Sequence, residues 1–87
     1  MFEAVQFAEV RGLTEPKETV LAEFAEEIDA VGATRSARDA FFESGSTDYA
    51  WWIVRKKGAR LASFISDSKS DKEFVLDLST GELIEVQ

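Results

Sequence analysis

The chain has 87 residues, of which 45% are hydrophobic and 31% charged, and its formal net charge is −7. This length predicts a single domain over residues 1–87 with one small core, and the apolar content excludes an intrinsically disordered chain. With no Cys there is no disulfide framework, and because neither a signal peptide nor a membrane-spanning run is recognisable, we expect a cytoplasmic protein without membrane contact.

The N-terminal segment, residues 1–10, fits two patterns. Phe2 and Val5 have helical spacing, whereas Val5 and Phe7 alternate as in a strand, and we favour the strand.

A helix is predicted from Thr14 to about Val31. Thr14 can cap its first turn, Pro16 is tolerated there, and Gly32 can end it. Apolar residues at three- and four-residue spacing would form its buried stripe: Val20, Leu21, Phe24, Ile28 and Val31. A second, shorter helix is expected from residue 34 or 36 to Gly45.

The second half of the chain predicts an antiparallel sheet. Strands are expected at 49–54, 60–65, 73–78 and 82–86, separated by turns at 56–59 and 79–81 and a polar loop at 66–72. The predicted fold class is α+β: two helices followed by a three- to four-stranded antiparallel sheet, to which the N-terminal segment can add a strand. Both faces of the 49–54 strand are apolar, so we expect the helices to cover one face and a partner or second copy the other.

The composition argues against catalysis. The chain has no His and no Cys, the commonest general bases, nucleophiles and zinc ligands. Glu23 and Glu27 share a predicted helical face, but there they would be solvated rather than held in an apolar pocket. Residues 67–73 resemble a calcium loop only loosely, because Lys69 takes a ligand position and the central Gly is missing. We therefore expect no catalytic residues, no metal and no cofactor.

Negative charge is concentrated in the first half, where eleven acidic residues face four basic ones, while residues 51–87 are balanced. The first predicted helix would carry an acidic face that attracts a basic protein. Its candidate partner-binding residues are Glu15, Glu18, Glu23, Glu26, Glu27 and Asp29. The alternative is that this face only keeps the protein soluble.

A basic cluster beside the two tryptophans raises the question of nucleic-acid binding; it comprises Arg55, Lys56, Lys57 and Arg60. We expect Trp51 and Trp52 to fill the core, lysines near a turn to protect a sheet edge, and the net charge to repel phosphates. No direct nucleic-acid binding is therefore predicted.

The C-terminal half carries a family resemblance. Trp51-Trp52-Ile53-Val54, followed by F-V-L-D-L-S-T-G-E-L-I-E-V at 74–86, resembles the aromatic strand and V-D-x-x-T-G-E-V hairpin of small bacterial immunity proteins of polymorphic toxin systems and, less closely, of PepSY domains. The resemblance covers about half the chain and implies a protein that blocks a toxin by binding it.

Together these patterns predict a non-catalytic protein-binding module. We expect an acidic inhibitor or immunity-type protein that blocks a basic partner through its helical face. Two alternatives remain: a nucleic-acid-mimicking inhibitor from a phage or defence system, and a small assembly module that forms homodimers or larger oligomers through its apolar sheet.

Overall fold

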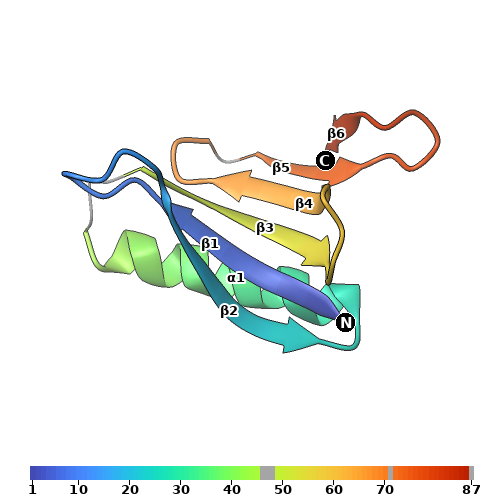
Figure 1. The fold of residues 1–87 in the computed structure, drawn as a ribbon, viewed down its shortest axis with the longest axis horizontal. Coiled ribbons are helices and arrows are strands. Elements are labelled where there is room, and N and C mark those ends of the chain that lie inside the picture. The colour runs from blue at the N-terminus through green and yellow to red at the C-terminus, as the bar shows by residue number, and fades with distance from the viewer. Residues whose placement is uncertain (46–48, 71, 87) are drawn as a thin grey trace.

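The computed structural model describes residues 1–45, 49–70 and 72–86, and within them it contains one helix and one six-stranded antiparallel sheet (Figure 1). The elements in chain order are β1 (Phe2–Ala8), β2 (Lys17–Phe24), α1 (Glu27–Glu43), β3 (Ala50–Lys56), β4 (Ala62–Asp67), β5 (Glu73–Leu76) and β6 (Leu83–Glu85). The strand order across the sheet is β2-β1-β3-β4-β5-β6. The fold is therefore α+β, as expected, but its arrangement differs from the predicted one.

The segment predicted as the first helix is mostly a strand. A loop leads into β2, which pairs with β1 from Phe2 opposite Phe24 to Ala8 opposite Lys17, and only the last residues of the segment enter α1. Val20, Leu21 and Phe24 have helical spacing, but pairing with β1 stabilises an extended backbone, and such tertiary contacts commonly override local propensity. A register shift opposite Ala4 and Val5 accommodates the additional residue Leu21.

The helix α1 is continuous where the sequence predicted a stop at Gly32 and a second helix. Gly32 lies inside α1, where it costs about 1 kcal/mol relative to Ala. Burial of Ala30 and Thr34 on either side of it stabilises the helix, and the Thr34 hydroxyl donates a hydrogen bond to the Val31 carbonyl at 2.7 Å. The prediction of two helices before the sheet is therefore wrong: a single described helix connects β2 to β3.

The predicted strands of the second half are confirmed in order and pairing. β3 to β6 form an antiparallel meander, with ends that differ by a few residues from those expected. The N-terminal strand is confirmed as β1. Asp48, predicted next to the first of these strands, and Asp71, predicted in the 66–72 loop, lie outside the described residues.

The core lies between α1 and one face of the sheet. α1 packs against β1, β2 and β3 (Figure 1). A buried cluster joins Ala30 of the helix to Ala4, Val54 and Phe64 of the strands. Trp52 has no exposed surface, and its Nε1–H donates to Gln6 Oε1 at 2.9 Å. α1 thus covers one half of the sheet on one side.

Within the described residues, no helix is both long and apolar enough to span a bilayer.

Candidate protein-binding face

The sheet face opposite α1, here called the open face, carries a row of apolar side chains across five strands. Because side chains alternate along a strand and directly paired residues share a face, the registers place this row on the side away from Trp52 and Val54. The apolar row consists of Val20, Val5, Ile53, Ile65 and Phe74.

No described helix lies over the apolar row, since α1, the one helix of residues 1–45, 49–70 and 72–86, packs on the other side. Val5 in β1 is fully buried, whereas Val20 at the sheet edge is 45% exposed. Ile53, Ile65 and Phe74 are half-buried. A row of this kind on an uncovered face is typical of an interaction surface.

Aromatic rings extend the open face on one side of the apolar row. Phe7 and Trp51 are direct cross-strand partners and stack with ring centroids 5.4 Å apart and an interplanar angle of 10°. Tyr49 continues this line, with its ring centroid 5.4 Å from that of Trp51. Rigid aromatic side chains bury large areas on binding and are enriched among the residues that dominate interface energies.

Charged side chains flank the apolar row on both sides: Glu3 and Arg55 lie on the side away from the aromatic rings, whereas Glu18 is the cross-strand partner of Phe7. Arg55 donates from Nε to Glu3 Oε1 at 3.1 Å and from Nη1 to Glu18 Oε1 at 2.9 Å. Partial burial of the guanidinium lowers the pKa of Arg55, but the hydrogen bonds to the two carboxylates outweigh this, so its pKa is raised overall. Lys57 pairs with Glu23 at 3.1 Å. These ion pairs form a polar rim on the open face, and the Arg55–Glu18 pair reaches across the apolar row at β1 and β2.

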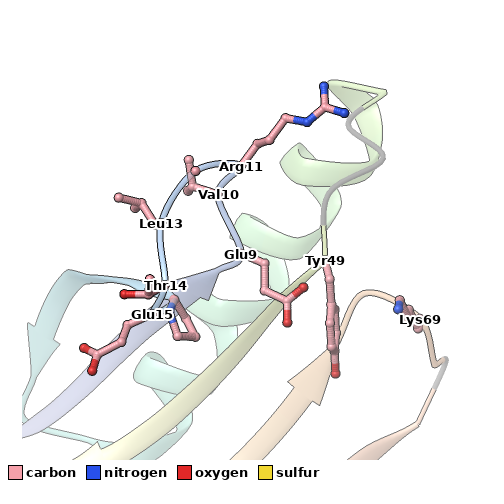
Figure 2. A pocket seen from close by; sticks show the side chains of 10 residues that line it. Glu9, Val10, Arg11, Leu13, Thr14, Glu15, Tyr49 and Lys69 are labelled. Carbon is pink, nitrogen blue, oxygen red and sulfur yellow. The ribbon is translucent and has the colours of Figure 1, made fainter.

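A pocket of about 790 Å³ lies where the loop between β1 and β2 approaches the aromatic side of the open face (Figure 2). Residues 9–16 of this loop line it together with Tyr49 and Lys69. The Glu9 backbone N–H donates to the Tyr49 carbonyl at 2.9 Å, which ties the loop to the start of β3. Gly12 adopts a φ of +92° that a side chain would strain, so the loop geometry depends on this glycine.

The phenol of Tyr49 lies among charged groups beside this pocket. Its hydroxyl is 3.5 Å from Asp67 Oδ2, and Lys69 Nζ is 4.6 Å from the ring centroid. Burial is the largest cause of the raised pKa of Tyr49, and the negative charges of Asp67 and Glu9 raise it further. The raised pKa keeps the tyrosine neutral near pH 7.

The six acidic residues predicted to share a helical face do not lie on one helix. Glu15 lies in the loop between β1 and β2, and Glu18 and Glu23 lie in β2, where they pair with Arg55 and Lys57. The remaining three, Glu26, Glu27 and Asp29, cap and begin α1, at the end of the helix dipole that favours negative charge. The prediction of an acidic face on one helix is therefore wrong, because these residues belong to a loop, to β2 and to the start of α1.

Most residues of the open face are not predicted from the sequence. Trp51, expected in the core with Trp52, lies on the opposite side of the sheet, where it stacks on Phe7. The alternation of Val5 and Phe7 was a usable signal for β1, whereas the contribution of Val20 was hidden by its helical spacing.

Two of the described carboxylates have a lowered pKa. A hydrogen bond from Arg35 lowers the pKa of Glu73, and hydrogen bonds from Ser79 lower the pKa of Asp77, which is the opposite of the shift that a general acid needs. In the described part of the chain, no group of three or more acidic side chains is arranged to hold a metal ion.

No family model matches this chain, and no significant match was found among curated proteins or solved structures.

Proposed function

We propose that this chain is a non-catalytic protein-binding module that engages a basic partner through its open face, as an inhibitor or immunity-type protein would. The observation that carries the proposal is the apolar row, which crosses five strands on a face that no described helix covers. Burial of this row and of the adjoining Phe7–Trp51 stack against a partner would supply hydrophobic binding free energy.

The charge of the chain supports a basic partner. The net charge of −7 generates a negative field that speeds association with a cationic surface. On the open face itself, Glu3 and Glu18 share the single guanidinium of Arg55, so the rim keeps an excess of negative charge. The acidic residues thus act mainly through steering, while the apolar row holds the complex together.

A second candidate is an assembly module that pairs with another copy through the same face. The row is apolar along its whole length, and two such faces can stack as the sheets of a β-sandwich do. The like charge of two copies opposes this arrangement at low salt, so a homodimer should strengthen as salt is added, whereas a complex with a basic protein should weaken.

Substitutions on the open face test the proposal. Val20→Lys and Phe74→Lys place a charge at each end of the apolar row, and Ile28→Lys is a matched control because Ile28 is 77% exposed on α1. Proteins captured from host lysate by the wild-type chain are purified, and their affinities for the three variants are measured by calorimetry. Circular dichroism first establishes that each variant is folded.

We expect both row variants to lose at least tenfold in affinity and Ile28→Lys to bind like the wild type. Equal binding by all four proteins would overturn the proposal. A salt-resistant dimer that Val20→Lys dissociates would instead favour the assembly module. Displacement of the captured partner by DNA would identify the nucleic-acid mimic of the sequence analysis.

A further inference from the structure

We propose that the pocket beside Tyr49 receives a Lys or Arg side chain of the partner, held between the Tyr49 ring and the Glu9 carboxylate. This inference rests on the proposed function and adds the chemical group that the partner inserts. The pocket of about 790 Å³ is larger than one such side chain, so the side chain enters together with part of the partner's backbone.

One side of the Tyr49 ring is already occupied by a cation of this chain. Lys69 Nζ lies 4.6 Å from the Tyr49 ring centroid, within the range of a cation–π interaction, so the ring binds an ammonium group of this chain. In Figure 2 the ring is seen edge-on, with Lys69 on one side and Glu9 on the other. The ring face on the side of Glu9 turns toward the loop 9–16.

The orientation of the charged side chains favours a cation over an anion. Glu9 directs its carboxylate toward the space between the loop and Tyr49, whereas Arg11, also in the pocket lining, extends its guanidinium away from it (Figure 2). The negative charge of Glu9 is close enough to raise the pKa of Tyr49, and Asp67 lies at the phenol hydroxyl. An anionic ligand would meet both carboxylates, whereas a guanidinium or ammonium would pair with Glu9 and stack on the ring.

The position of the pocket suits an anchor for the proposed complex. Tyr49 and Trp51 are neighbours on the open face, with ring centroids 5.4 Å apart, so a partner lying on the apolar row reaches the pocket without a break. The loop holds its shape through the Glu9–Tyr49 backbone hydrogen bond and a turn in which the Leu13 N–H donates to the Val10 carbonyl at 3.1 Å. A basic side chain therefore meets a preformed site.

The test is a titration of the ¹⁵N-labelled chain with N-acetyl-arginine methylamide and N-acetyl-lysine methylamide, followed by heteronuclear NMR. N-acetyl-citrulline methylamide is the neutral control, and N-acetyl-aspartate methylamide is the anionic one. We expect saturable shifts of the Glu9, Gly12 and Tyr49 amides with the two cations and none with the other two probes. Saturable binding of the anion instead, or equal shifts with citrulline, would overturn the inference.

Variants identify the groups that bind. Glu9→Gln should weaken binding of the arginine probe roughly fivefold, and Tyr49→Leu similarly, because each removes one of the two interactions. Glu82→Gln, an exposed acid in the loop between β5 and β6, is the control and should leave binding unchanged. Lys69→Met should tighten binding about two- to threefold, because it removes a competing positive charge from the ring. An unchanged affinity in Glu9→Gln contradicts the inference.

The titration is independent of the experiments on the apolar row. Loss of the partner in Val20→Lys without any binding of the arginine probe would leave the proposed function standing and refute the pocket. If the arginine probe binds, but the partner binds the row variants as tightly as the wild type, the pocket stands and the proposed function of the apolar row is refuted.

Discussion

Trp51 and Trp52 are adjacent in sequence, yet we expect very different consequences when each is replaced by Phe. Trp52 is fully buried under α1, where its ring lies edge-on to Phe41 with centroids 5.5 Å apart and its N–H donates to Gln6. Trp51 is half-buried on the open face and stacks on Phe7. The pair therefore tests which side of β3 faces the core.

The magnitude follows from what each substitution removes. Replacing Trp52 by Phe removes about 2 kcal/mol of hydrophobic stabilisation, at roughly 0.8 kcal/mol for each buried carbon group. Loss of its hydrogen bond to Gln6 costs about 1 kcal/mol more. We expect a loss of about 3 kcal/mol in the free energy of unfolding, and less than about 1 kcal/mol for Trp51→Phe, which keeps an aromatic stack. A chain of this length has about 4–13 kcal/mol of stability, so the Trp52 variant should still fold under native conditions.

Urea unfolding followed by far-ultraviolet circular dichroism measures both variants without depending on tryptophan fluorescence. In thermal scans the expected difference of at least 2 kcal/mol corresponds to roughly 8–16 °C in Tm. An equal or larger destabilisation by Trp51→Phe would refute the assignment of Trp52 to the core and, with it, the open face.

Two further predictions concern stability. Gly32→Ala should stabilise the chain by about 1 kcal/mol, because an added Cβ meets no atom within 4 Å in the interior of α1. Gly81→Ala should destabilise it by a similar amount, because Gly81 has a φ of +74°. Urea midpoints that move in the same direction for both variants would contradict this prediction. The hydrogen bonds from Arg35 lower the pKa of Glu73, so their stabilisation is complete above the unfolded-state pKa of the carboxyl and is lost as the pH falls through its lower folded-state pKa. The difference in unfolding free energy between wild type and Glu73→Gln should accordingly be largest at neutral pH and shrink in acid, and a difference independent of pH would show that this ion pair contributes nothing.

The sequence by itself determined the second half of the fold. From β3 to β6, segments rich in aromatic and β-branched residues alternate with turns rich in Gly, Lys and Ser. The pairing of short antiparallel strands joined by such turns depends mainly on local geometry. The two apolar faces of β3 also indicated that one of them would meet something other than the helix. Composition determined the negative charge, and with it the expectation of a basic partner.

Only the tertiary structure decided the conformation of residues 17–24. Their apolar residues have a spacing that fits a helix, and the choice of a strand depends on pairing with the preceding strand β1, whose residues pair with all of β2 except Leu21. Once β2 is a strand, Glu18 and Glu23 turn to Arg55 and Lys57 and the acidic helical face no longer exists. The apolar row likewise arises from strand registers, because its five residues come from five separate strands and no local pattern can align them.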